Sequence, residues 1–386
     1  MTLAVAVSGQ NLEEAYFRSK AAMQLQQYQV AAEAILSVPE NKRTKNMLFT
    51  LGESYYFSEQ YDEAIKVFEA VEQPEAQLYT ARIYAMMNRP VQAVEHLKKY
   101  LGRREKLFES ELQLDSALEK IEHSKEWRML WEKDWYNASE KKASDAASLL
   151  KRKKYTDALA VIDENLARNT SSVRLWTLRA QVYEAMGEDQ PALESYRSAI
   201  RLRNNADHCL RASAIALRLQ KNELALELAQ NAIRTDPYRL DAYLQRAEAF
   251  RSVKRYDEAR KDIRFYFTYL PEDAKALYQM GITETEGGNP LEGAEYLSVL
   301  INGDNTRPDY FTARASAYIK AGHYSQANDD LAQALDLNPC SPEIWLKKGI
   351  ALHQENKSGD ACHYWQKAME LGSREAGKYF IKYCGK

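Results

Sequence analysis

Residues 240–271 read LDAYLQRAEAFRSVKRYDEARKDIRFYFTYLP, and this stretch carries the pattern that decides the fold. Two small residues, Ala247 and Ala259, stand twelve positions apart, and large apolar residues such as Tyr243 lie at helical spacing around them. Two helices cross closely only where side chains are short, and aromatic residues fill the remaining space between them. The stretch therefore predicts two packed helices that end before Pro271, because proline cannot continue a helix.

The second small residue of this pair returns about every 34 positions. It occurs seven times in succession, as Ala158, Ala192, Ala225, Ala259, Gly293, Ala327 and Ala361. The same frame continues towards the N-terminus at Ala31, Ala64 and Ala93. A fixed period of this length is typical of an array of two-helix repeats. We therefore expect ten repeats.

The residues of these repeats resemble the tetratricopeptide repeat. Trp176, Ala180, Tyr183 and Ala192 match the W-x2-L-G-x2-Y and A-x3-F positions of that family, and Pro271 matches the terminal proline of a later repeat. The resemblance, taken as one to a bacterial-type member, implies an all-α fold, a right-handed α-solenoid of stacked helix-turn-helix repeats. No strand is expected.

The repeat frame is broken once, between Ala81 and Ala146, where the chain holds about 31 residues more than one period. We interpret the extra residues as one degenerate helical hairpin. The predicted organisation is a truncated signal peptide or disordered tail at 1–10, three repeats at 11–101, the degenerate hairpin at 102–141, seven repeats at 142–373, and a capping helix at 374–386.

Three of the six tryptophans lie in the predicted hairpin, as Trp127, Trp131 and Trp135. At this spacing they would share one face of a helix. One interpretation is that the stripe packs against the neighbouring repeats and sets the angle between the two arrays. The other is that it forms an exposed surface for a partner.

Arginine replaces the usual leucine of the family at Arg179, Arg246 and Arg314. A buried charge without a partner is costly. We therefore expect each arginine to pair with an acidic residue of a neighbouring repeat, with a ligand-binding role as the alternative.

Composition and charge exclude several function classes. The chain is 45% hydrophobic and 28% charged, and its 53 basic and 55 acidic residues leave a net charge of −2. Nucleic acid is disfavoured as a partner, because binding its backbone requires a concentrated basic face. No stretch approaches the ~20 apolar residues that span a membrane. The run Lys151-Arg152-Lys153-Lys154 is interpreted as a solvated helix end, with anion contact as the alternative.

The chemistry-bearing residues form no catalytic or metal-binding pattern. The cysteines Cys209, Cys340, Cys362 and Cys384 show neither a CxxC motif nor zinc spacing with histidine. We expect no cysteine to staple the fold, and the redox state of the four stays open. No cofactor and no enzymatic activity are expected.

The N-terminal run Leu3-Ala4-Val5-Ala6-Val7, followed by Ser8-Gly9, resembles the end of a secretory signal peptide. It lacks a basic region and is short. We interpret residues 1–10 as a truncated export signal, which places the protein in the periplasm or cell envelope. Association with an envelope complex would be consistent with that location. A frayed apolar tail on a cytoplasmic protein is the alternative.

In the family that the repeats resemble, partners bind the concave groove formed by the first helix of each repeat. The groove positions of this sequence supply both polar and apolar side chains, as in Arg174, Thr177, Gln181, Leu210, Leu217, Leu244, Glu248, Arg251, Lys275 and Tyr278. Such a lining suits an extended peptide or a helix. The Lys/Asn set with which chaperone-binding members clamp a terminal carboxylate is absent.

The predicted function is a non-enzymatic scaffold or adaptor that binds proteins or peptides. The alternative is a sensor whose solenoid changes curvature when a peptide or small molecule binds. The identity of the partner and the oligomeric state stay open.

Overall fold

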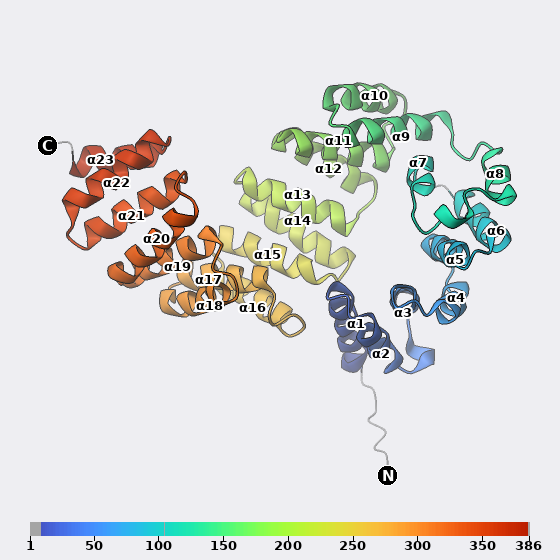
Figure 1. The fold of residues 1–386 in the computed structure, drawn as a ribbon, viewed down its shortest axis with the longest axis horizontal. Coiled ribbons are helices and arrows are strands. Elements are labelled where there is room, and N and C mark those ends of the chain that lie inside the picture. The colour runs from blue at the N-terminus through green and yellow to red at the C-terminus, as the bar shows by residue number, and fades with distance from the viewer. Residues whose placement is uncertain (1–8, 104, 385–386) are drawn as a thin grey trace, which may run out of the picture. The chain divides into compact units, whose positions relative to one another are not determined.

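The computed structural model describes residues 9–103 and 105–384, and the regular elements of this part of the chain are helices (Figure 1). Contacts between Cα atoms divide the chain into two compact units, unit 1 at residues 1–242 and unit 2 at residues 243–386. Helices α1 to α14 belong to unit 1, helices α16 to α23 belong to unit 2, and the division falls inside α15.

The helices of unit 1 are α1 (Gly9–Gln24), α2 (Tyr28–Leu36), α3 (Lys45–Phe57), α4 (Tyr61–Glu69), α5 (Pro74–Met86), α6 (Pro90–Leu101), α7 (Glu109–Gln113), α8 (Lys125–Trp131), α9 (Ala138–Lys151), α10 (Tyr155–Arg168), α11 (Val173–Met186), α12 (Asp189–Leu202), α13 (Ala206–Arg218) and α14 (Asn222–Thr235). Two short 3₁₀ helices, η1 (Glu40–Lys42) and η2 (Glu119–Ile121), lie between them.

The remaining helices are α15 (Leu240–Ser252), α16 (Tyr256–Phe267), α17 (Ala274–Glu286), α18 (Pro290–Gly303), α19 (Pro308–Ala321), α20 (Tyr324–Leu337), α21 (Pro342–Gln354), α22 (Ser358–Glu370) and α23 (Arg374–Tyr383). Consecutive helices pack as hairpins, for example α13 with α14 and α19 with α20 (Figure 1).

The small residues of the repeat frame lie where the two helices of a hairpin cross. Ala158, Ala259 and Ala327 are fully buried. A Cβ atom added to Gly52 would lie 2.5 Å from the ring of Phe68, so this crossing has no room for a side chain. The predicted all-α solenoid of stacked two-helix repeats is confirmed.

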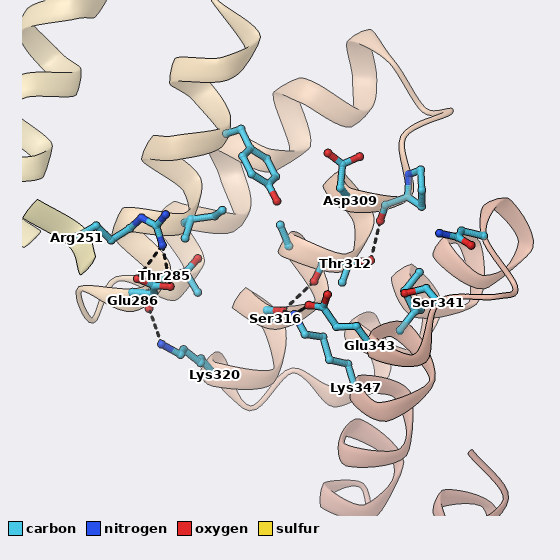
Figure 2. A pocket seen from close by; sticks show the side chains of 16 residues that line it. Arg251, Thr285, Glu286, Asp309, Thr312, Ser316, Lys320, Ser341, Glu343 and Lys347 are labelled. Carbon is cyan, nitrogen blue, oxygen red and sulfur yellow. Dashed lines mark hydrogen bonds and ion pairs between the residues drawn. The ribbon is translucent and has the colours of Figure 1, made fainter. Parts of the chain in front are cut away.

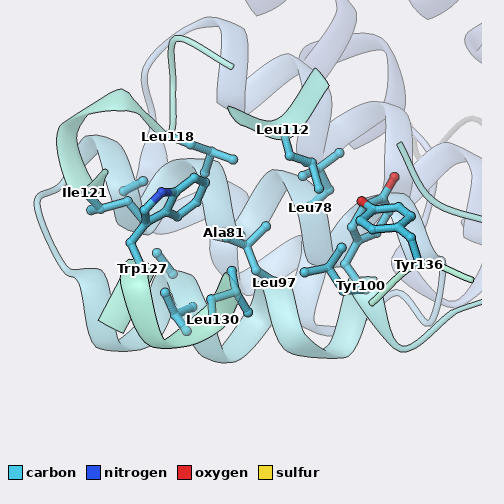
Figure 3. Close-up of a cluster of buried hydrophobic side chains, with 14 residues drawn as sticks. Leu78, Ala81, Leu97, Tyr100, Leu112, Leu118, Ile121, Trp127, Leu130 and Tyr136 are labelled. Atoms are coloured by element: carbon cyan, nitrogen blue, oxygen red, sulfur yellow. The ribbon is translucent and has the colours of Figure 1, made fainter. Parts of the chain in front are cut away.

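The segment between the sixth and ninth helices holds the short elements α7, η2 and α8. Their apolar side chains pack on α5 and α6 in one buried cluster, which includes Leu112, Leu118 and Ile121 of this segment together with Leu97 of α6 (Figure 3). The segment therefore extends the core of the N-terminal repeats.

The tryptophan stripe differs from its prediction, because α8 ends at Trp131 and Trp135 lies outside the helix. The carboxylate of Asp134 accepts a hydrogen bond from the backbone N–H of Tyr136 (3.3 Å), a local turn that competes with helix. Trp127 is 8% exposed, and the partly buried Trp131 and Trp135 pack against the same cluster. These contacts support the packing interpretation over an exposed partner surface.

All three repeat-frame arginines pair with an acidic side chain, as expected. Arg179 donates to Asp163 (2.8 Å), which belongs to the preceding repeat. The partners of the other two were predicted wrongly: Arg246 pairs with Asp262 (2.7 and 2.6 Å), in the second helix of its own repeat. Arg314 pairs with Asp330 of its own repeat in the same way, at 2.9 and 2.7 Å. The cause is helix pairing, which brings residues sixteen positions apart together across one hairpin.

A disulfide joins Cys362 of α22 to Cys384, the residue after α23, with their Cα atoms 5.8 Å apart. The expectation that no cysteine staples the fold was therefore wrong. The two cysteines are 22 residues apart in sequence, and the α22–α23 turn brings them together. Cys209 is a buried free thiol and Cys340 an exposed one.

The predicted signal segment, residues 1–10, lies almost entirely outside the described residues, and α1 begins at Gly9. The run Lys151–Lys154 is exposed at the end of α9 and in the turn before α10. In the part of the chain that the structure describes, no helix is long and apolar enough to cross a membrane. Among the same residues, no three His, Cys, Asp or Glu side chains gather as a metal ion would require.

Candidate peptide-binding groove

A cavity of about 420 Å³ lies in unit 2 along the first helices of consecutive repeats (Figure 2). We call it the unit 2 groove. It is lined by Arg251 at the end of α15, by Tyr278, Ile282, Thr285 and Glu286 of α17, by Pro308, Asp309, Thr312, Ala313, Ser316 and Lys320 of α19, and by Asn338, Ser341, Glu343, Ile344 and Lys347 in and before α21.

Short side chains on α19 leave the space that forms the groove. The hydroxyl of Thr312 donates to the carbonyl of Pro308 (2.7 Å), and the hydroxyl of Ser316 donates to the carbonyl of Thr312 (2.8 Å). Because these hydroxyl protons are used within the helix, the hydroxyl oxygens face the groove as acceptors. Pro308 and Pro342 start their helices, a position at which proline costs no hydrogen bond.

One end of the groove carries an arginine and a lysine beside a glutamate (Figure 2). Nη1 of Arg251 lies 3.3 Å from both carboxylate oxygens of Glu286. The buried Nε of Arg251 has no hydrogen-bond partner in the described part of the chain. Nζ of Lys320 lies 3.5 Å from the carbonyl oxygen of Thr285, near the C-terminal end of α17, where a cation is favoured by the helix dipole.

The other end of the groove carries two ion pairs at its rim. Nζ of Lys347 donates to the hydroxyl of Ser316 (2.9 Å) and lies 2.8 Å from a carboxylate oxygen of Glu343. Asp309 pairs with Arg307 at 2.8 Å. Three basic and three acidic side chains thus line the groove beside the apolar Ile282, Ala313 and Ile344, so it favours a ligand with both polar and apolar groups.

Tyr278 places an aromatic ring in the wall. Its ring centroid lies 5.8 Å from that of Tyr310. Burial raises the pKa of its hydroxyl, and the negative charges of Asp309 and Glu343 raise it further, so the hydroxyl stays protonated. This hydroxyl has no hydrogen-bond partner among the described residues and can donate to a bound ligand.

In unit 1 two of the five predicted groove residues are already engaged with other parts of the unit. The guanidinium of Arg174 lies 3.1 Å from the ring centroid of Phe108 and donates to the carbonyl of Lys106 (2.7 Å). Thr177 shares a hydrogen bond of 3.1 Å with His208. Both side chains therefore hold the repeats together. Three further candidates, Gln181, Leu210 and Leu217, are half-buried.

In unit 2 the sequence prediction located part of the groove. Arg251 and Tyr278 line it. Glu248 lies 4.0 Å from Arg251 but outside the lining, and Lys275 is exposed outside the lining. Leu244 is a correction, because it is 1% exposed and contributes to the core.

The α19 residues of the groove were missed. Asp309, Thr312 and Ser316 stand one period of 34 residues after Lys275, Tyr278 and Ile282, so extending the same register by one repeat finds them. Lys320 and Lys347 lie outside that register and carry no comparable signal in the sequence.

Two family models match the chain. The tetratricopeptide repeat model matches residues 312–375. The model of ChAPs (Chs5p-Arf1p-binding proteins) matches residues 5–208, which is more than half of the 386 residues.

Curated relatives share the repeats over part of their length. A TPR repeat-containing protein of Methanocaldococcus jannaschii is 24% identical over 241 residues, which are 59% of this chain and 42% of that protein. The Protein SGT1 homolog of Bos taurus is 30% identical over 97 residues, 25% of this chain and 29% of that protein. The chain thus spans less than half the length of either relative, and the predicted bacterial type is not established.

Solved structures agree with the fold. A tetratricopeptide repeat protein from Parabacteroides merdae superposes with a TM-score of 0.58 at 17% identity and covers 64% of this chain and 99% of its own. The APC/C hetero-tetramer Cut9-Hcn1 gives a TM-score of 0.50 at 12% identity and covers 95% of each chain. From its repeats and from the family match over residues 5–208, the chain is a tetratricopeptide repeat protein that belongs to the Chs5p-Arf1p-binding proteins.

Proposed function

We propose that the protein is a non-enzymatic adaptor that binds an extended peptide or a short helix of a partner protein in the unit 2 groove. The family models that match the chain are those of the tetratricopeptide repeat and of ChAPs, and tetratricopeptide repeats are protein-interaction modules. The observation that carries the proposal is the cavity of about 420 Å³ along consecutive first helices.

The chemistry of the wall favours a peptide. Ile282, Ala313 and Ile344 offer apolar contacts, Tyr278 adds a hydroxyl to the wall, and Nε of Arg251 has no partner in the described part of the chain. Peptide backbone and side chains supply both acceptors and apolar groups at short intervals. A ligand of one kind only, fully apolar or fully charged, would leave part of this wall unmatched.

The family name supplies candidate partners. Its members are named for binding Chs5p and Arf1p. We propose proteins of these two kinds as partners, with unit 1 as the unit that engages them, because the family match covers residues 5–208. A second partner in the unit 2 groove would then make the protein a bridge between two proteins.

A sensor that binds a small molecule is the second candidate, since a cavity of about 420 Å³ lies in the size range of small-molecule sites. A small ligand would raise the melting temperature of the isolated protein without any partner. A peptide adaptor gives this shift only with the peptide.

The predicted periplasmic or envelope location stays a proposal. The Cys362–Cys384 disulfide supports an oxidising compartment, because glutathione and thioredoxin keep cytosolic thiols reduced. Cell fractionation with thiol labelling tests this location. If the protein is exported, Cys362 in the envelope fraction should not react with the thiol label because it is in the disulfide. A cytosolic protein whose Cys362 reacts with the label contradicts the location.

The groove is tested by filling it. Ser316→Trp places an indole in the centre of the cavity, and Val299→Trp places the same group on α18, where Val299 is 56% exposed and outside the groove lining. We expect Ser316→Trp to abolish binding of fluorescent partner peptides and Val299→Trp to leave it unchanged. Equal binding by Ser316→Trp and the parent protein, with equal melting temperatures, would refute the proposal.

A further inference from the structure

A second cavity, of about 310 Å³, lies in unit 1 between α11 and α12. We call it the arginine pocket. It is lined by Trp176, Arg179, Glu194, Arg197, Ser198 and Arg201. Three guanidinium groups therefore face a space that contains one carboxylate, although the whole chain is close to neutral.

Two of these arginines lack a carboxylate partner. Arg197 and Arg201 are exposed one helical turn apart on α12, a spacing at which like charges repel. Within the described residues Arg197 has no ion pair, and Arg201 donates only to the hydroxyl of Ser198 (3.1 Å). Glu194 accepts a hydrogen bond from Gln190 (2.6 Å) and neutralises neither arginine.

Comparison with the other repeats shows which acidic residue is missing. Arg246 and Arg314 each bind, through two hydrogen bonds, the aspartate sixteen positions later. Sixteen positions after Arg179 stands Ser195, which accepts from Nη1 of Arg179 at 3.1 Å. Arg179 therefore relies on Asp163, which is 50% exposed. In this repeat a serine therefore stands where the other two hold a buried aspartate, and Arg197 and Arg201 lie on the same helix, α12.

Trp176 supplies a fixed aromatic wall. Its indole Nε1 donates to the carbonyl of Thr170 (2.9 Å), which holds the ring in place. The guanidinium of Arg179 lies 5.8 Å from the ring centroid. A planar ring that enters the pocket can pack against the indole while its charged group reaches the arginines.

We propose that the arginine pocket binds an aryl phosphate, with the phosphate on Arg197 and Arg201 and the ring on Trp176. Guanidinium groups bind phosphate oxygens through paired, charge-assisted hydrogen bonds. In the pocket, neither Arg197 nor Arg201 is paired with a carboxylate, and the indole of Trp176 forms an aromatic wall beside them. The site lies in unit 1 and is independent of the peptide proposed for the unit 2 groove.

The test is titration of the full chain with phenyl phosphate, inorganic phosphate and phenol by calorimetry. Phenyl phosphate is expected to bind most tightly and phenol not to bind. The double variant Arg197→Ala/Arg201→Ala should weaken phenyl phosphate binding by about tenfold or more. Arg234→Ala is the matched control, because Arg234 is an exposed arginine at the corresponding turn of α14, and it should change nothing.

Trp176→Leu tests the contribution of the aromatic ring to binding, because it should remove the preference for phenyl phosphate over inorganic phosphate. Tighter binding of a phosphotyrosine peptide than of phenyl phosphate would indicate that the natural aryl phosphate belongs to a protein partner. Equal affinity would indicate a small aryl phosphate. The proposal is overturned if phenyl phosphate shows no saturable binding, or if the double variant binds it as tightly as the parent protein. Equal affinity of the parent for inorganic and phenyl phosphate overturns the role of Trp176.

Discussion

Breaking the Cys362–Cys384 disulfide should loosen the C-terminal end of the solenoid. Helix α23 covers the fully buried Trp365 of α22, and the rings of Tyr379 and Tyr383 lie 5.3 and 5.7 Å from that indole. Without the bond, α23 is held by these ring contacts, by the contact of Tyr383 with His353, and by the packing of Ala376 and Phe380. The perturbation is the double variant Cys362→Ser/Cys384→Ser, compared with the oxidised and the reduced parent protein.

The magnitude follows from the length of chain that the bond closes. The cysteines are 22 residues apart, and the chain-entropy model gives about 3 kcal/mol for a loop of this size. In a repeat array this loss falls on the terminal elements, because each repeat contacts only its neighbours. We expect α23 to open about a hundredfold more often in the double variant, since each 1.4 kcal/mol is a factor of ten.

Hydrogen exchange resolved by peptide measures this opening. Amides of α23 should exchange faster in the double variant and in the reduced parent, while amides of α17 stay unchanged. Cys340→Ser is the matched control, because Cys340 is an exposed free thiol and its loss should have no effect. Equal exchange of α23 in the oxidised parent and the double variant would refute the reasoning, because packing alone would then hold the helix.

Three further predictions concern packing, charge and pH. Gly281→Val should lower stability by about 1–3 kcal/mol, because a Cβ at Gly281 would lie 2.6 Å from Cγ of Leu297; an unchanged melting temperature would contradict this. Arg246→Ala should cost about 3 kcal/mol in urea unfolding by leaving Asp262, 8% exposed, without its partner, and Arg246→Met/Asp262→Leu should recover most of it; an equal loss in both variants would count against the pair. Burial lowers the pKa of His208 below its ordinary 6.5, so on acidification the unfolded chain takes up a proton before the folded chain does, and the free energy of unfolding should fall as pH drops below about 6.5. The melting temperature of His208→Gln should therefore fall less between pH 7 and pH 5 than that of the parent protein. An identical fall in both proteins would show that His208 does not cause the pH dependence.

Much of the fold was predictable because helix packing dictates residue size at fixed positions. A crossing such as that of Gly52 with Phe68 leaves no space for a Cβ, so the small residue must recur with each repeat. Part of the groove was predictable for the same reason: the repeat fixes which residues of the first helix face the groove, and Arg251 and Tyr278 lie there.

Other features depend on contacts that the repeat period does not encode. Leu244 occupies a groove position by register, yet it is buried because neighbouring side chains cover it. Trp135 has the helical spacing, yet the side chain of Asp134 binds the backbone of Tyr136 and the helix ends before it. The disulfide joins cysteines 22 residues apart, a separation that no short motif marks and that only the α22–α23 turn brings within bonding distance.

The central claim, that the unit 2 groove binds a segment of a partner protein, is tested most directly by crosslinking from inside the groove. A photo-reactive amino acid replaces Ser316 in one variant and the exposed Val299 of α18 in another. We predict that position 316 crosslinks to one short continuous segment of a partner and that position 299 does not. Crosslinks to that partner from position 299 alone, or none from position 316 in its presence, would contradict the account.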